Sequence, residues 1–299
     1  MALPLATVQG EESREALPTS EGLRAWRHFR RNRGAVVALV VLSLIVLAAI
    51  FAPFLTHQDP LAQNLAQALQ APSSAHLFGT DEYGRDEFAR ILFGARTALE
   101  TGLVVVLISL TVGTLWGLLS AFYGGLWDMV LMRVADVFMA FPFLLLALMI
   151  VAALGPGLMQ AEIAIAITYM PVYARPVRSV GLGLKSLEFV QAAKSVGARD
   201  AAILWRHFLP NLLPTLLVQA TLNVGTAIID VAGLSFLGMG VQPPTADWGA
   251  MLSDGQNFIL LSPWLVLAPG IAILVVVLAA NLVGDGLRDA LDPRQRHQA

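Results

Sequence analysis

The sequence has no cysteine, and only 13% of its 299 residues are charged. The absence of cysteine excludes disulfide frameworks, cysteine-ligated zinc and cysteine nucleophiles. The low charge excludes a soluble domain, because such domains carry about 25% charged residues. Since 57% of the residues are hydrophobic, we expect an integral membrane protein that lies in a lipid bilayer.

Three further absences narrow the function. A formal net charge of -2 gives no electrostatic footprint for nucleic acid. The five histidines lack the spacing of metal ligands. The phosphate-binding pattern G-x-x-x-x-G-K-[ST] is missing, because Leu184 precedes Lys185 where glycine is needed, and no G-x-S-x-G elbow occurs. We expect no catalytic residue, metal site or cofactor in this chain, so energy for transport must come from a partner or an ion gradient.

Long apolar runs predict an all-α membrane protein. A spanning helix needs about 20 mostly apolar residues, whereas barrel strands would give short alternating segments of about ten. Glu162 and Pro171 interrupt the fourth run, which is the least clean. The predicted six spans are residues 34–55, 98–121, 129–154, 159–177, 212–234 and 264–287.

The placement of lysine and arginine predicts the topology. Most of the 19 basic residues lie before the first span, in the loop 178–210 and after the last span. Because basic residues concentrate on the cytoplasmic side, both termini and this loop are expected in the cytoplasm. The predicted organisation is a cytoplasmic tail (1–25), an interfacial helix with the first span and an external loop (26–97), a five-span core (98–287) and a cytoplasmic tail (288–299). Trp26 and Phe29 would lie at the lipid headgroups, unless this segment is an ordinary positive anchor.

The loop 178–210 predicts two short helices that meet at a glycine corner. Glu188 to Val196 favours the first helix, and Gly197 suits the left-handed residue after it. Asp200 favours the start of a second helix, which is expected to end before Pro210 because proline lacks an amide donor. Small residues at the corner would allow another surface to approach closely.

This loop resembles the EAA motif of ABC importer permeases, in which EAA is followed by three residues, Gly, nine residues and I-x-L-P. Gln191-Ala192-Ala193 is followed at that spacing by Gly197 and later by Leu209-Pro210. Gln191 replaces the family's Glu and His207 replaces its Ile; a generic amphipathic hairpin is the alternative interpretation. The resemblance implies that this segment couples to an ATPase through Glu188, Gln191, Ala192, Ala193, Lys194, Gly197, Ala198, Arg199, Asp200, Leu209 and Pro210.

Other segments resemble the C-type permease subunits of dipeptide and oligopeptide importers. They include FRRNRGAVVALV (29–40), HLFGTDEYGRDEFARILFGAR (76–96) and LSFLGMGVQPPTADWGAMLSD (234–254). The resemblance implies a type I ABC permease bundle in the bacterial inner membrane. It also implies a second homologous permease, two ATP-binding subunits that hold ATP and Mg, an external solute-binding protein and a peptide substrate. Dipeptides are favoured, with oligopeptides, glutathione or nickel as alternatives.

Charged residues near the membrane centre are candidates for the translocation path because they are costly there. Asp230 could face a wet cavity, or could accept hydrogen bonds that hold the bundle together. Asp136 follows Arg133 by three residues, which favours a local ion pair. A different class of function would use both aspartates as the proton relay of a secondary transporter.

The external segments hold candidates for contact with the solute-binding protein. Turn and cap chemistry is the alternative role of the charged residues in G-T-D-E-Y-G-R-D. The aromatic residue that follows Pro243-Pro244 could gate the external mouth or anchor the loop at the membrane interface. The candidates are Asp81, Glu82, Arg85, Asp86 and Trp248.

Overall fold

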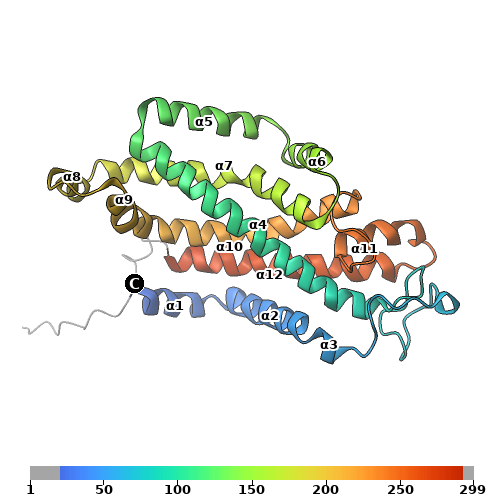
Figure 1. Cartoon of the computed structure of the whole chain (residues 1–299). Helices are drawn as coiled ribbons and strands as arrows, with labels where there is room; N and C mark the ends of the chain where they lie inside the picture. The colour runs from blue at the N-terminus through green and yellow to red at the C-terminus, as the bar shows by residue number, and fades with distance from the viewer. Residues whose placement is uncertain (1–20, 292–299) are drawn as a thin grey trace, which may run out of the picture.

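The computed structural model describes residues 21–291, which form an elongated bundle of helices (Figure 1). Within this range there is no strand, and a single isolated bridge joins Thr80 to Asp86. The α-helices are α1 (Glu21–Arg31), α2 (Arg33–Ile50), α3 (Ala52–Leu55), α4 (Glu87–Tyr123), α5 (Gly125–Ala140), α6 (Phe143–Leu154), α7 (Leu158–Lys185), α8 (Glu188–Ser195), α9 (Asp200–Ile203), α10 (Leu209–Phe236), α11 (Trp248–Gly255) and α12 (Trp264–Leu291).

Four helical segments between residues 21 and 291 are long and apolar enough to cross a membrane: α2, α4, Asp200–Phe236 and α12. The bent pair α5 and α6 makes a fifth if it counts as one span. The fourth expected span corresponds to α7, which has 28 residues but is more polar and contains two prolines. The structure therefore confirms the helical membrane class, and the number of six spans stays a prediction.

The expectation of one continuous helix over residues 129–154 is wrong. The chain breaks at Phe141 and Pro142, and α5 meets α6 at 97°. The residue before a proline disfavours the helical region, and Phe141 accordingly has φ -91 and ψ 145. Pro142 has no amide hydrogen with which to continue the helix. As a result α5 lies along the outside of the bundle, while α6 runs in a different direction and buries Ala147 and Val151 in the core (Figure 1).

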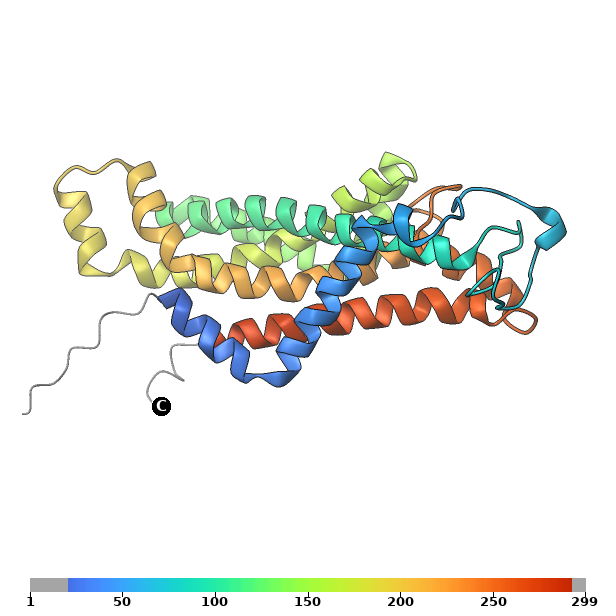
Figure 2. The ribbon, with the colours of Figure 1, turned by 90° about the horizontal axis from the view of Figure 1, so that it is seen from below.

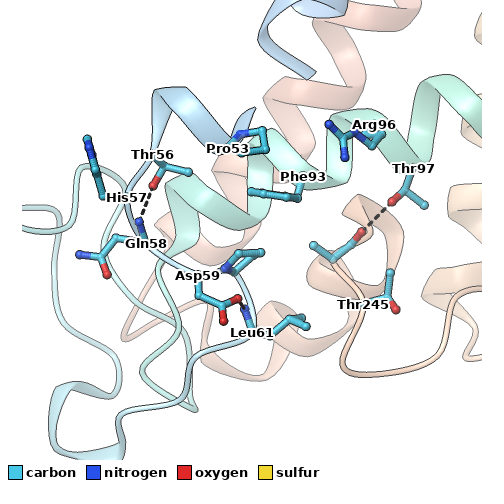
Figure 3. A pocket seen from close by; sticks show the side chains of 12 residues that line it. Pro53, Thr56, His57, Gln58, Asp59, Leu61, Phe93, Arg96, Thr97 and Thr245 are labelled. Carbon is cyan, nitrogen blue, oxygen red and sulfur yellow. Dashed lines mark hydrogen bonds between the residues drawn. The ribbon is translucent and has the colours of Figure 1, made fainter. Parts of the chain in front are cut away.

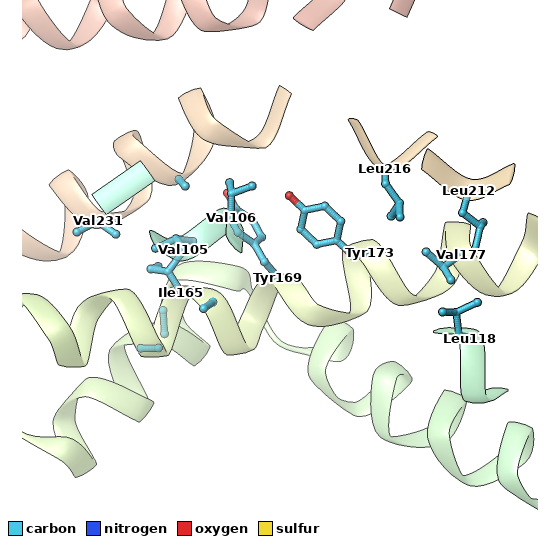
Figure 4. Packing of buried hydrophobic residues seen from close by; sticks show 14 of the residues in the cluster. Val105, Val106, Leu118, Ile165, Tyr169, Tyr173, Val177, Leu212, Leu216 and Val231 are labelled. Atoms are coloured by element: carbon cyan, nitrogen blue, oxygen red, sulfur yellow. The ribbon is translucent and has the colours of Figure 1, made fainter. Parts of the chain in front are cut away.

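The core lies where α4, α7 and α10 pack together. Figure 4 shows Tyr173 and Val177 of α7 among residues of α4 and α10 that include Val106, Leu118 and Leu212. The backbones of α4 and α7 approach closely at Gly113, where an added Cβ would lie 2.6 Å from the Met170 carbonyl oxygen. Small residues at such crossings bring membrane helices into tight contact.

The two ends of the bundle carry different elements. The start of α1 and the end of α12 lie at the same end as α8 and α9 (Figures 1 and 2). The long loop, residues 56–86, lies at the opposite end together with α11. The segments rich in arginine therefore gather at one end, as expected from the charge distribution.

The structure buries one of the two aromatic residues of α1, and the interfacial position of the other stays a prediction. Trp26 is 50% exposed, and its ring stacks on Phe29 with centroids 5.8 Å apart. Phe29 itself is buried and packs against Gly286 of α12. Phe29 thus fixes α1 to the bundle instead of lying at the lipid headgroups, and Trp26 is the residue left exposed.

Candidate functional site

The glycine corner expected after α8 is present in the structure. Gly197 has φ +77, in the left-handed region. Its amide donates to the Lys194 carbonyl over 3.0 Å, and the Ala198 amide donates to the Ala193 carbonyl over 3.0 Å. These two bonds are the Schellman pattern that ends a helix at glycine. We call residues 188–200 the α8 corner.

The α8 corner has a buried root. Val190, Ile203 and Phe208 are fully buried in the main core. Lys194, one of the expected coupling residues, points back to the bundle, with Nζ 4.6 Å from the centre of the Phe122 ring. Phe122 in turn lies edge-on to Phe208, 5.7 Å between centroids. Apolar packing and a cation–π contact thus fix the corner to the end of α4.

The outer side of the α8 corner is open. Val196 is 84% exposed beside the exposed Gly197, and sequence reasoning missed it although a large apolar residue before a glycine corner is a recognisable signal. Ala193, Ala198 and Leu209 are half-buried between this surface and the root. The exposed candidates are Glu188, Gln191, Ala192, Lys194, Gly197, Arg199, Asp200 and Pro210.

The sequence suggested that the second helix of this loop ends before Pro210, but the helix continues past this residue. Residues Asp200–Phe236 run as one helical segment of 37 residues. A π turn over Leu204–Phe208 joins α9 to α10, and the Leu209 amide donates to the Leu204 carbonyl five residues back. Pro210 is the second residue of α10, and the π turn directly before it lets the helix continue although proline has no amide hydrogen to donate. The corner is therefore continuous with a helix that is long and apolar enough to cross a membrane.

Two aspartates fix α5 to α7. Asp136 accepts from Arg175 Nη2 over 2.6 Å and lies 3.6 Å from Arg133 Nη1. The local pair with Arg133 confirms the sequence prediction, but the closer partner on α7 was missed because nothing in the sequence links α5 to α7. Asp128 accepts from Arg178 Nε and Nη2, each over 2.5 Å. Such bidentate contacts hold both position and orientation.

Asp230 faces a neighbouring helix. Its Oδ2 accepts from the Tyr169 hydroxyl of α7 over 2.6 Å. The Tyr169 ring lies against Phe143 of α6, 4.8 Å between centroids. Asp230 therefore joins α7 to α10 by a hydrogen bond, and its place in a translocation path stays a prediction. Asp136 and Asp230 bind different residues of α7, so the structure does not show them as one relay.

The charged residues of the long loop form turns and caps. Asp81 Oδ1 accepts from the amides of Tyr83 and Arg85, and its Oδ2 accepts from Arg85 Nε over 2.5 Å. Asp86 caps the start of α4 and lies 2.8 Å from His76 Nδ1. All of these side chains except Tyr83 are buried. Glu82 is partly exposed, and contact with another protein stays a prediction for the whole set.

Glu87, at the start of α4, is a buried acidic residue beside this loop. Glu87 is 2% exposed, and its Oε1 has no hydrogen-bond partner among residues 21–291. Glu87 is the first residue of α4 and lies about 16 Å before the apolar run that begins at residue 98, so it lies outside the hydrocarbon layer. Burial raises the pKa of Glu87 to about 8 against the attraction of Arg90. Loss of hydration also raises the pKa values of Glu82 and Asp254.

Trp248 is not an aromatic residue at the membrane interface. It is 2% exposed, and its indole N–H donates to the Ile91 carbonyl of α4 over 3.1 Å. A Cβ added at Gly94 would lie 2.8 Å from its ring. Trp248 therefore anchors α11 to α4. Pro243 and Pro244 are exposed in the loop before it. Within the described range no three His, Cys, Asp or Glu side chains are placed to hold a metal.

Comparison with known families assigns this helix bundle to a class of membrane transport proteins. Residues 113–297 match the family described as the inner membrane component of binding-protein-dependent transport systems. Residues 20–72 match the N-terminal transmembrane domain of oligopeptide transport permease C. The chain belongs to this family of permeases for binding-protein-dependent import, whose members are non-catalytic subunits.

Relatives cover almost the whole chain. A dipeptide transport system permease protein, DppC of Alkalihalophilus pseudofirmus, is 47% identical over 91% of this chain and 90% of its own length. A glutathione transport system permease protein, GsiD of Escherichia coli, is 45% identical over 90% of this chain and 89% of its own. An inward-facing structure of the MetNI methionine ABC transporter has the same fold, with TM-score 0.55 and 18% identity over 69% of this chain and 97% of that one.

Proposed function

We propose that this permease subunit belongs to an ATP-driven importer of dipeptides or other short peptides. Two relatives at similar identity carry the names of dipeptide and glutathione systems, and both substrates are short peptides. Oligopeptides and nickel are the alternative cargoes. In the proposed assembly this chain pairs with a second homologous permease, two ATP-binding subunits that hold ATP and Mg, and an external solute-binding protein.

The proposed orientation places the α8 end of the bundle in the cytoplasm. The chain then crosses the bacterial inner membrane six times, with α5 and α6 as one bent crossing and α7 as the next. This orientation is supported by the arginine residues of α1 and of the α7–α10 region, which share one end. Both termini are cytoplasmic in this arrangement, and the long loop and α11 face the solute-binding protein through partly exposed residues such as Glu82.

The α8 corner is the proposed handle for the ATP-binding subunits. The observation that carries this proposal is its division into a fully buried root at Val190 and an open surface at Val196. A force applied to the open surface reaches α7 directly and reaches α10 through the continuous helix that starts at Asp200. ATP binding would move the corner, open the path outward to the loaded binding protein, and hydrolysis would reset it.

Reconstitution tests this function. The four membrane and ATPase subunits are placed in proteoliposomes with the solute-binding protein, and uptake of a labelled dipeptide is measured. We expect uptake that requires ATP and the binding protein and that persists without a proton gradient. Uptake driven by a proton gradient in the absence of ATP would contradict the proposal.

A secondary transporter that uses Asp136 and Asp230 is the alternative of another class. Asp230→Asn separates the two functions because it keeps a side-chain oxygen for the Tyr169 hydroxyl. In an ATP-driven importer the variant keeps ATPase activity, and any loss of uptake reports a role of Asp230 along the path. In a proton-driven transporter, the variant abolishes gradient-driven uptake.

A further inference from the structure

Two neighbouring cavities meet at Arg96 of α4. The upper cavity, about 700 Å³, lies between the chain after α3, the α4 residues Phe93 and Thr97, and the loop at Ala246 (Figure 3). The second, about 380 Å³, lies between α2, α4, α10 and α12 and is lined mainly by aliphatic side chains such as Leu103. We call it the apolar cleft. Arg96 lines both.

The two cavities lie at different depths in a membrane. The apolar run of α4 begins at residue 98, so Arg96 lies just outside the hydrocarbon layer. Leu103, in the apolar cleft, is about 10 Å further along the helix at about 1.5 Å per residue. The upper cavity is therefore at the level of lipid headgroups, and the apolar cleft is at the level of acyl chains.

The guanidinium group of Arg96 is held by two hydrogen bonds and keeps further N–H donors free within the described residues. Its Nη2 donates to the carbonyls of Ala49 and Ile50 at the end of α2, over 3.3 and 3.2 Å. Among residues 21–291, Nε and Nη1 have no acceptor. A fixed guanidinium fork with free N–H groups matches the oxygens of a phosphate. The aliphatic cleft below it matches hydrocarbon.

The remaining charges decide which headgroup fits. Asp59 lines the upper cavity beside the exposed His57, and its Oδ1 accepts from the Leu61 amide over 2.9 Å. Glu100 lines the apolar cleft one turn beyond Arg96. One guanidinium and two carboxylates disfavour a ligand with net negative charge. They favour a phosphate that carries a cationic ammonium group beside it.

We propose that these cavities form a binding site for a zwitterionic glycerophospholipid with a primary ammonium headgroup. The phosphate binds Arg96, the ammonium group lies toward Asp59, and an acyl chain fills the apolar cleft. The lipid then completes the contact between α2 and α4. This site is independent of the ATP-driven function, because it does not involve the α8 corner.

The test measures lipid retained by the purified transporter complex. The complex is stripped in detergent, incubated with phosphatidylethanolamine, phosphatidylglycerol or diacylglycerol, and analysed by native mass spectrometry. We expect one phosphatidylethanolamine per copy of this chain, with occupancy at least tenfold above the other two lipids. Equal retention of diacylglycerol would overturn the phosphate contact, and equal retention of phosphatidylglycerol would overturn the role of the ammonium group.

Three variants locate the site. Arg96→Gln removes the fork, and Val46→Trp fills the apolar cleft while leaving Arg96 in place. Both are expected to lower occupancy at least tenfold. Arg133→Gln, on the exposed side of α5, is the matched control and is expected to keep it. Because Arg96 also holds the end of α2, Val46→Trp separates lipid binding from that role. Wild-type occupancy in both site variants would overturn the proposal.

Discussion

The long loop and the α8 corner lie at opposite ends of the bundle. They differ in whether their polar side chains are buried or exposed. In the long loop, Asp81 and Arg85 are each 4% exposed and satisfy one another. In the α8 corner, the buried residues are apolar, and the exposed surface combines small, polar and apolar side chains around Val196. The charged side chains of the long loop are thus paired with one another inside the loop, whereas the side chains of the α8 corner remain exposed.

This contrast teaches where to look for a partner surface. The charged residues of the long loop are the more conspicuous in the sequence, yet burying them in pairs makes them part of the scaffold. An open apolar residue such as Val196, held on a fixed root, is what a docking partner can cover. Substitutions in the long loop should therefore affect stability, whereas substitutions in the α8 corner should affect assembly and transport.

The largest expected effect is a loss of stability in the long loop. Arg85→Ala removes the closer partner of the buried Asp81 carboxylate and leaves Arg90, 3.6 Å away, as its remaining charged neighbour; we expect a loss of up to about 3–5 kcal/mol. Thermal unfolding of the purified complex measures this cost. Arg133→Ala, whose side chain is 81% exposed, is the control and should change stability by less than about 0.5 kcal/mol. Equal effects of the two variants would remove the contrast between buried and exposed charge.

The next effect concerns the shape of the α8 corner. Gly197→Val forces a β-branched residue into φ +77, a conformation that costs L-residues about 1–2 kcal/mol. We expect ATP-dependent uptake to fall because the corner no longer keeps its geometry. Gly183→Val is the control, since neither glycine has any atom within 4 Å of an added Cβ and only Gly197 has positive φ. Unchanged uptake with Gly197→Val would show that the corner's geometry does not matter.

A charge at the exposed tip should act on assembly and not on folding. Val196→Asp alters a residue that is 84% exposed, so stability should change by less than about 0.5 kcal/mol. Retention of the ATP-binding subunits during purification should fall about tenfold, a change of about 1.4 kcal/mol. Leu260→Asp, at a residue 99% exposed near α11, is the control. If both variants lose these subunits equally, the two ends do not differ as proposed.

The last effect is a dependence of the long loop on pH. The pKa of Glu87 rises from 4.5 to about 8 on burial, so the folded loop binds a proton that the unfolded chain releases. The resulting stability is complete below pH 4.5 and is lost as pH rises to about 8. Hydrogen exchange of residues 77–90 should therefore quicken between these limits. Glu87→Gln should remove this dependence, while Glu188→Gln, in the exposed α8 corner, should leave it intact.

Local features were predictable from the sequence, and contacts between distant segments were not. The left-handed Gly197 follows from glycine at a helix end, and the pair of Arg133 with Asp136 follows from their spacing. The bend at Pro142 was missed although proline alone could have indicated it. Hydropathy gives the length of an apolar run but does not show where the helix breaks, so residues 129–154 were predicted as one continuous helix.

Tertiary packing determines the contacts of the remaining residues. Arg175 and Asp136 are far apart in the sequence and meet because α5 folds back beside α7. Trp248 was expected at the membrane interface because its type is common there, but Gly94 opens a place for its ring on α4. Pro210 was expected to end a helix, and the π turn before it lets the helix continue. In each case the contacts with residues nearby in space outweighed the usual structural preference of the residue type.

That π turn also sets the rotation of α10 about its own axis. An α-helix advances about 100° per residue, and the hydrogen bond from Leu209 back to Leu204 accommodates one residue more than an α-helical turn does. Removing a single residue from Leu204–Phe208 would restore a regular turn and rotate α10 about its axis by about a quarter of a revolution. Asp230 would then no longer point at Tyr169, so an irregularity at one end of the helix fixes the rotational register of a contact far along it.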